Sequence, residues 1–187
     1  VWIGRGPLGA RDGRLALYFR DQVGNLAWPL DLERPDGPVH EAIRTALADR
    51  GASFFSDLYA AAGGGDPADT VDAIWDLVWS GEITNDTLAP LRAYLQGTRR
   101  AARSRGPSLP SASAPPAASG RWYPVADLTA GPDPTMAAAA RAEQLLERHG
   151  VVVREAVLAE AVPGGFAGLY PVLAAMDGAE TALAMQD

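Results

Sequence analysis

The chain has 187 residues, 48% of them hydrophobic, and a net charge of −7, which is enough for one large domain or two small ones. The absence of cysteine excludes a disulfide framework and a thiolate metal site, and it agrees with a reducing cytoplasmic location. No apolar run approaches the ~20 residues of a membrane span and no signal peptide is present, so no membrane partner is expected.

Residues 1–37 contain one convincing strand, at 14–19, preceded by a turn at Asp12-Gly13. A single strand must pair with something, so residues 1–37 are predicted to be the strand-containing edge of a neighbouring β-domain. The first residue is Val1 rather than methionine. We therefore expect the chain to be a segment of a longer protein.

Residues 38–96 are predicted to form a first winged-helix unit. Its first helix has an apolar stripe and ends at Gly51, and Asp66 is the expected N-cap of its third helix, before Pro67. Residues 82–85 are expected to be a wing strand and 88–95 a closing helix. The side chains expected to face the core from the second and third helices are Phe54, Phe55, Leu58, Val71, Ile74, Trp75 and Val78.

Residues 97–133 are predicted to be a flexible linker, because the stretch 104–120 is rich in Ser, Pro and Ala. The segment 97–121 holds five arginines and no acid. These arginines either lie along a phosphate backbone, with salt-dependent and sequence-blind affinity, or keep a solvated tether soluble. Trp122 either stacks on an unpaired base or packs in a core. The DNA-binding candidates are therefore Arg99, Arg100, Arg103, Arg105, Arg121 and Trp122.

Residues 134–187 are predicted to form a second winged-helix unit. The pattern at 50–58 recurs at 149–157 without a gap, and each copy ends a helix at glycine and starts a second helix. A third helix follows in each, ending at Gly81 and at Gly178. The sequence after Gly178 does not match a wing hairpin, so either the chain stops early within this unit or a stretch is missing there. The fold class is mainly α with short β, as tandem winged-helix (helix-turn-helix) units plus the edge of a β-structure.

The third helix of a helix-turn-helix normally enters the major groove, where phosphates favour positive charge. In the first copy this helix carries four aspartates and no base, and in the second copy residues 163–176 carry no charged side chain. Both helices are therefore interpreted as scaffold rather than as readers of DNA. His40 and His149 stand in separate units, so neither a metal site nor a catalytic residue is predicted.

Several motifs resemble the region beyond the motor core of the large helicase-related proteins, Lhr. They are Gly51-Ala52-Ser53-Phe54-Phe55, residues 73–81, Thr84-Asn85-Asp86-Thr87, Gly120-Arg121-Trp122, residues 142–146 and residues 162–167. The resemblance implies a bacterial ATP-dependent DNA helicase of DNA repair that translocates 3′ to 5′. It also implies a long C-terminal region of winged helices and a β-barrel, similar to winged-helix DNA glycosylases.

The chain has no Gly-x-x-x-x-Gly-Lys-Ser/Thr motif and no lysine, so the resemblance assigns ATP and Mg²⁺ to the parent motor and no cofactor to this segment. We expect a domain scaffold with non-specific contact to single-stranded or duplex DNA. Its other expected partners are further domains of the same chain and a second copy. Two alternatives stay open: an interaction or oligomerisation module that never touches DNA, and part of the frame of a DNA-glycosylase-like domain.

Overall fold

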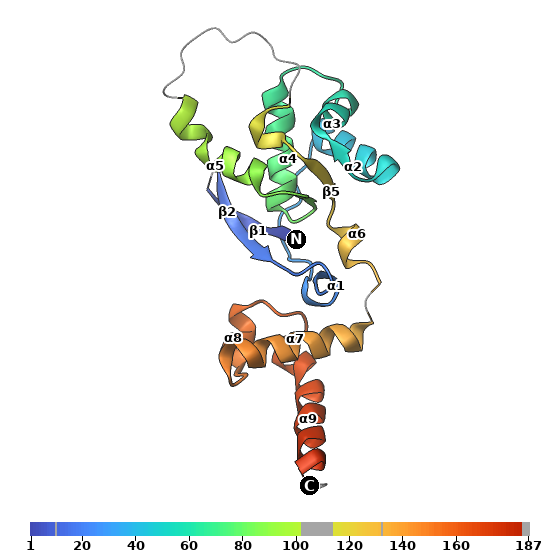
Figure 1. The fold of residues 1–187 in the computed structure, drawn as a ribbon, viewed down its shortest axis with the longest axis vertical. Helices are drawn as coiled ribbons and strands as arrows, with labels where there is room; N and C mark the ends of the chain where they lie inside the picture. The colour runs from blue at the N-terminus through green and yellow to red at the C-terminus, as the bar shows by residue number, and fades with distance from the viewer. Residues whose placement is uncertain (10, 102–113, 132, 185–187) are drawn as a thin grey trace. The chain divides into compact units, whose positions relative to one another are not determined.

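The computed structural model describes residues 1–9, 11–101, 114–131 and 133–184, with the backbone alone at 97–101 and 177–184 (Figure 1). The chain divides into unit 1, residues 1–17 and 31–128, and unit 2, residues 18–30 and 129 onward. In the part that the model describes, no helix is long and apolar enough to cross a membrane.

Unit 1 is built on a winged helix. Its three helices are α2 (Pro38–Arg50), α3 (Phe55–Ala61) and α4 (Pro67–Trp79). Its antiparallel sheet has the order β3-β5-β4, from β3 (Ser53–Phe54), β4 (Ile83–Asn85) and β5 (Arg121–Pro124). The predicted first helix, third helix and wing strand of this unit are thus confirmed.

The strand β5 corrects the prediction of a flexible linker over 97–133. Trp122 pairs with Ser53 on one side and with Asn85 on the other, so β5 is the central strand of the sheet. The described parts between β4 and β5 form the wing of unit 1, with α5 (Ala89–Ala101) and the 3-10 helix η1 (Pro116–Ala118). Residues 102–113 of the predicted linker lie outside the described residues. Composition could not predict β5, because the pairing of a strand with distant partners is not a property of its local sequence.

Local capping in unit 1 follows the sequence. The Asp66 carboxylate accepts a hydrogen bond of 2.9 Å from the Ala68 amide, and Pro67 begins α4. The expected core residues are buried or partly buried, with one exception. Phe54 is 55% exposed, because Ser53 before it faces the core and successive strand residues face opposite sides.

The N-terminal hairpin belongs to unit 1 and not to a neighbouring β-domain, which corrects the prediction for residues 1–37. β1 (Trp2–Gly9) pairs antiparallel with β2 (Asp12–Leu17). The Trp2 indole donates to Thr87 O over 3.0 Å, and Thr84 Oγ1 donates to Trp2 O. The strand β1 escaped prediction because it holds three glycines at 4, 6 and 9 and a proline, which strands disfavour.

An aromatic cluster forms the centre of unit 1. The Trp75 ring stacks on Tyr94 of α5 at 4.0 Å between centroids, on Trp2 of β1 at 6.3 Å, and meets the edge of Trp122 of β5 at 6.0 Å. Its indole N–H donates to Ala117 O in the segment of η1, over 2.8 Å. The helix α4 is thereby packed against the hairpin, the wing and the sheet at once.

A half-buried ion pair ties α2 to the turn after α4. The Arg44 guanidinium donates from Nε and Nη2 to the two Glu82 carboxylate oxygens, over 2.6 and 2.7 Å. Burial alone would raise the pKa of Glu82, but the hydrogen bonds and the charge of Arg44 outweigh it and lower that pKa. The ion pair therefore stabilises the folded state at neutral pH, and this stabilisation is lost as the pH falls through the lowered pKa of Glu82.

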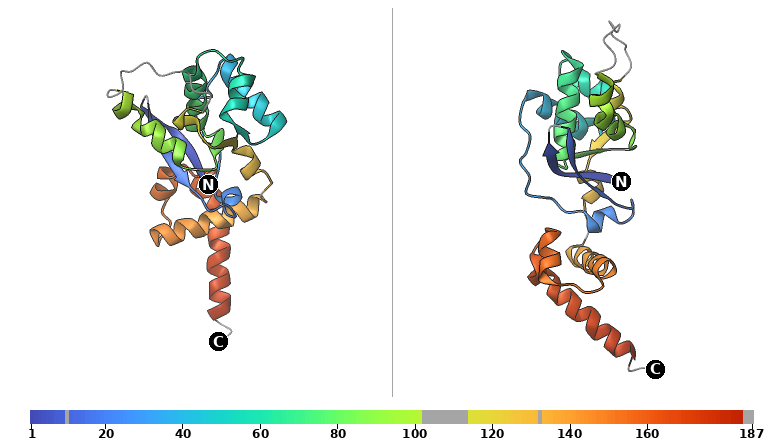
Figure 2. Two further views of the ribbon diagram at one scale, coloured as in Figure 1. Left: turned by 45° about the horizontal axis from the view of Figure 1, so that its top comes forward. Right: turned by 90° about the vertical axis from the view of Figure 1, so that its left-hand side faces the viewer.

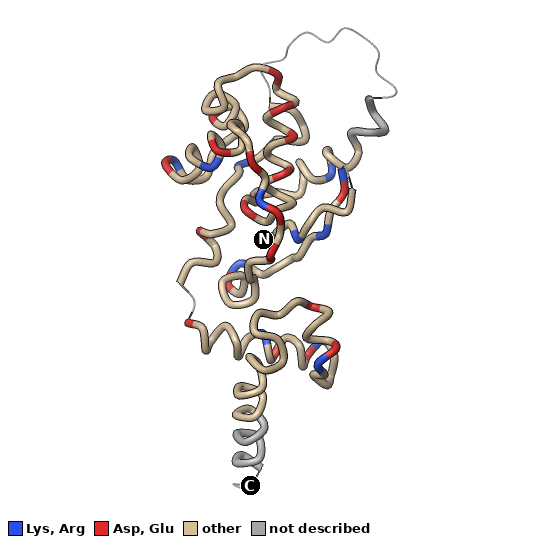
Figure 3. The backbone as a smooth tube through the Cα atoms, turned by 180° about the vertical axis from the view of Figure 1, so that it is seen from behind, with Lys and Arg blue, Asp and Glu red and all other residues tan. Residues whose placement is uncertain are grey.

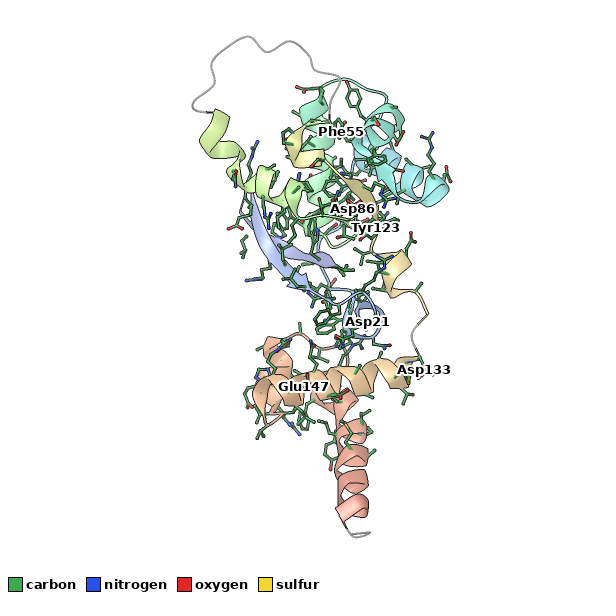
Figure 4. The ribbon with its side chains drawn as sticks, viewed as in Figure 1. Asp21, Phe55, Asp86, Tyr123, Asp133 and Glu147 are labelled. Atoms are coloured by element: carbon green, nitrogen blue, oxygen red, sulfur yellow. The ribbon has the colours of Figure 1, made fainter. Side chains whose placement is uncertain are left out.

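Unit 2 consists of helices in its described part. They are α1 (Val23–Leu26), α7 (Pro134–His149), α8 (Arg154–Ala159) and α9 (Gly165–Ala184), while α6 (Ala126–Thr129) lies at the boundary of the units. Figure 4 marks Asp133 at the start of α7, where its carboxylate accepts from the Thr135 amide over 2.8 Å. The predicted end of the third helix at Gly178 is wrong, since an interior glycine costs only ~1 kcal/mol.

The repeated pattern has the same backbone role in both units. Gly51 and Gly150 end α2 and α7 with φ of +71° each, a conformation that favours glycine. After α8, however, Ala161 adopts φ +51°, and the Val162 amide donates to Val157 O over 3.3 Å, as in a Schellman cap. In unit 1 the corresponding position after α3 is Gly63, with φ +86°.

The close approach of β1 to α4 predicts a large effect of Gly4→Ala. An added Cβ would lie 1.9 Å from the Val78 carbonyl oxygen, which is backbone and cannot move aside. Figure 2 shows the N-terminal hairpin next to α4. We expect a loss of about 3 kcal/mol in the free energy of unfolding, measured by urea denaturation. Gly9→Ala in the same strand is the control, since nothing lies within 4 Å of its added Cβ. Equal stability of the two variants would contradict the docking of the hairpin on α4.

The strained cap after α8 predicts that Ala161→Gly stabilises the protein. Relief of the left-handed conformation should add about 1 kcal/mol, visible as a higher Tm in calorimetry. Ala156→Gly, inside the helix α8, should instead lower Tm, because glycine weakens a helix interior. A lower Tm for Ala161→Gly would contradict the backbone conformation of this turn.

Candidate nucleic-acid interface

The helix α4 of unit 1 occupies the place of a recognition helix, but most of it is enclosed. From Ala73 to Trp79 every side chain except that of Asp76 is buried. The exposed positions of its first turns include Asp69 and Asp72, which repel phosphate. A helix with this burial and charge can neither enter a groove nor read base edges.

Two of the candidates predicted from the sequence lie on β5. Trp122 is 0% exposed and donates its indole N–H to Ala118 O over 3.1 Å, so the prediction that it stacks on a base is wrong and it packs in the core. The Arg121 side chain is 55% exposed, and its Nε lies 3.3 Å from Asp86 Oδ2. Figure 4 places Asp86 beside β5, and this carboxylate neutralises the charge that Arg121 would offer to a phosphate.

The remaining candidates lie on or beyond α5. Arg99 and Arg100 belong to its last turns, so they stand on a helix of the wing rather than on a tether. Arg103 and Arg105 lie outside the described residues. The six predicted residues therefore do not form one group. Arg99 and Arg100 lie on α5, Arg121 and Trp122 lie on β5, and the other two lie outside the described residues.

Sequence reasoning missed the arginines of the hairpin. Arg11, Arg14 and Arg92 are all exposed, and the Arg11 guanidinium lies 5.7 Å from the ring centroid of Tyr94 on α5. This contact brings the hairpin turn to the helix that carries Arg92 (Figure 3). We call Arg11, Arg14 and Arg92 the basic surface. Its signal in the sequence was the arginine-rich stretch 5–14, which was not connected with α5 because β1 was not recognised.

Charge is divided sharply within unit 1. Residues 1–17 and 89–101 carry six arginines and one aspartate, a net charge of +5, whereas residues 31–88 carry twelve acids and three arginines, a net charge of −9. Figure 3 shows acidic positions along α4 and basic positions along the hairpin and α5. Phosphate is therefore attracted to one side of the winged helix and repelled from its usual recognition helix.

The histidines serve structure in the described conformation. His40 Nε2 lies 3.1 Å from Asp76 Oδ2, which connects α2 with α4, and His149 Nε2 lies 3.0 Å from Glu160 Oε1. Burial raises the pKa of Glu160, but hydrogen bonds from His149 and Arg148 outweigh this effect and lower it. Among the described residues, no group of three or more His, Asp or Glu side chains is placed to hold a metal ion.

Unit 2 has a hollow of about 720 Å³ at the junction of α8 and α9. We call it the α8–α9 hollow. Its lining residues are Arg154, Leu158, Gly164, Phe166, Ala167 and Tyr170. The Arg154 guanidinium lies 5.5 Å from the Phe166 ring centroid, and the Phe166 and Tyr170 rings lie 6.2 Å apart.

Comparison with known proteins connects both units to one family. Residues 131–182 match the winged-helix domain of the large helicase-related protein. A protein of Mycolicibacterium smegmatis named Lhr helicase/probable uracil glycosylase is 38% identical over 195 aligned positions, covering 96% of this chain and 13% of that protein. The Lhr helicase/uracil glycosylase of Escherichia coli K12 is 32% identical over 203 positions, covering 95% of this chain and 13% of that protein.

The alignments to these two proteins run through nearly the whole chain and thus through both units, while the chain spans about an eighth of the length of each relative. The resemblance drawn from the sequence motifs is therefore confirmed. This chain belongs to the large helicase-related family, as a segment of its winged-helix C-terminal region.

Proposed function

We propose that this segment is an architectural, DNA-guiding part of an Lhr-type helicase of DNA repair, which contacts the sugar–phosphate backbone through the basic surface of unit 1. One observation carries the proposal. The helix that would normally read DNA is enclosed and acidic, while exposed arginines lie on the hairpin and on the wing helix α5.

Arginine suits this role because its guanidinium binds phosphate oxygens through paired N–H donors and stays charged at any physiological pH. Contacts to phosphate carry no sequence information, so binding is non-specific and falls as salt rises. The same contacts serve single strands and duplexes, with a shallower salt dependence for single strands.

We further propose the activity of the whole protein from its family. ATP hydrolysis with Mg²⁺ and 3′-to-5′ translocation belong to the motor, which acts on chromosomal DNA in the cytoplasm. The relatives are named as helicases and uracil glycosylases over their full lengths. We place base excision outside this segment, whose role is to order neighbouring domains along the DNA.

The proposal predicts that the double substitution Arg11→Gln with Arg92→Gln weakens DNA binding equally for unrelated sequences. Each phosphate contact contributes about 0.9 to the slope of log K against log salt on duplex DNA, so the slope should fall by about 1.8. Fluorescence anisotropy of labelled DNA across salt concentrations measures both quantities. Glutamine keeps most of the side-chain stem, so packing on Tyr94 changes little.

The matched control is Arg34→Gln with Arg50→Gln, which removes the same charge from the acidic part of unit 1. We expect this control to retain the slope of the unchanged protein. Equal losses in both double variants would assign the effect to net charge alone, and an unchanged slope in the first would overturn the basic surface as the DNA contact.

A second comparison concerns the arginines predicted from the sequence. Replacing Arg99, Arg100, Arg103 and Arg105 with glutamine should weaken binding further, because this group continues along and beyond α5. Binding that is unchanged in this quadruple variant would confine the contact to the hairpin and the start of α5.

A further inference from the structure

The α8–α9 hollow is lined in part by large hydrophobic side chains that are exposed to solvent. Leu158 and Tyr170 are 73% and 61% exposed, although both are large hydrophobic side chains of a helical unit. Two further lining residues, Gly164 and Ala167, are too small to fill the space, and Arg154 carries a positive charge. The volume lies in the range of sites that accept small molecules.

The hollow combines an aromatic face with a fixed positive charge. Tyr170 is exposed next to Phe166, and the Arg154 guanidinium, a donor of paired N–H groups, lies over the Phe166 ring. The first turn of α9 also lines the hollow, and the N-terminus of a helix adds positive partial charge. Glu160, the nearby acid after α8, is engaged by Arg148 and His149.

A ligand that matches both features has a flat aromatic part and an anionic part. Among the six lining residues, Arg154 and Tyr170 carry the hydrogen-bonding side-chain groups. With Arg154 on a phosphate, the tyrosine hydroxyl alone does not identify one base over another. Stacking on tyrosine accepts every base, because each has a π-face. The bases of a duplex are already stacked on each other, so only an unpaired base is available to Tyr170.

We propose that the α8–α9 hollow binds one unpaired nucleotide of single-stranded DNA, with its base on the Tyr170 ring and its phosphate at Arg154. This inference rests on the proposed function, because it requires the chain to reach DNA. The hollow is then a second DNA contact of the chain, in addition to the basic surface of unit 1, and the two contacts prefer different forms of DNA. The basic surface accepts any nucleic-acid backbone, whereas the hollow distinguishes a single strand from a duplex.

The test compares Tyr170→Leu and Tyr170→Phe in the full 187-residue chain, with Phe19→Leu as the matched control. Phe19 is also a highly exposed aromatic residue of unit 2, and it does not line the hollow. The probes are a single-stranded oligonucleotide containing 2-aminopurine and a duplex of the same sequence. Circular dichroism of each variant is the check that its helices are retained.

Tyr170→Leu should weaken single-strand binding about five-fold or more, leave duplex binding unchanged and remove the quenching of 2-aminopurine that stacking causes. Tyr170→Phe should keep both affinity and quenching, since the ring and not the hydroxyl makes the contact. Arg154→Gln should weaken single-strand binding and retain partial quenching. Phe19→Leu should behave as the unchanged protein.

Single-strand affinity that is unaltered in Tyr170→Leu would overturn the hollow as a nucleotide site, while the proposed function would stand if the Arg11 and Arg92 variant still lost affinity for both probes. Loss of self-association in Tyr170→Leu without a change in DNA binding would also overturn it, in favour of a contact between copies. A chain that binds neither probe at low salt would overturn the proposed function and the hollow together.

Discussion

The burial of Trp75 determines the architecture of unit 1. This side chain contacts an aromatic ring from β1, from α5 and from β5, and its indole N–H donates to a backbone carbonyl of η1. A tryptophan buries a large apolar area and has a single donor that requires a partner. Segments that are far apart in the sequence therefore converge on one helix, and from Ala73 to Trp79 all of its side chains except Asp76 are buried.

The enclosure of α4 changes what a winged helix can do. The hairpin and the wing occupy positions around the helix that normally enters a groove, and the acidic residues left exposed on it repel phosphate. The covering elements themselves carry arginines on their solvent side. In the proposed function, DNA therefore contacts the elements that cover α4 and not the recognition helix, and the winged helix supports these elements.

Local signals in the sequence predicted the helices well. The glycines at 51 and 150, the cap at Asp66 and the apolar stripes depend on neighbouring residues, and each is found as expected. The long-range pairings could not be predicted in this way. Nothing in the Ser- and Pro-rich stretch before Trp122 indicates that it returns to pair with Ser53, and the glycines of β1 suggest a loop until Val78 is seen against Gly4.

The same contrast between local signals and long-range pairing applies to the candidate DNA-binding residues. Arg99 and Arg100 were found by composition, but their place on a wing helix depends on the sheet pairing of β5. Trp122 was kept as a DNA-binding candidate, with packing in a core as the alternative, because it follows Arg121 at the end of the basic stretch. Strand alternation sends the two side chains to opposite faces, and Trp122 is the buried one. The α8–α9 hollow is formed where α8 and α9 meet, and no pattern in the sequence predicts this arrangement.

The most direct test uses the absence of cysteine, because a single engineered cysteine can then be labelled without background. A benzophenone probe at Leu95→Cys on α5 and one at Ala68→Cys on α4 stand on exposed positions of the same unit. If DNA lies on the basic surface, photocrosslinking to labelled DNA occurs from position 95 and is absent from position 68. Crosslinking from position 68 alone would contradict the enclosure of α4 and return DNA contact to the recognition helix.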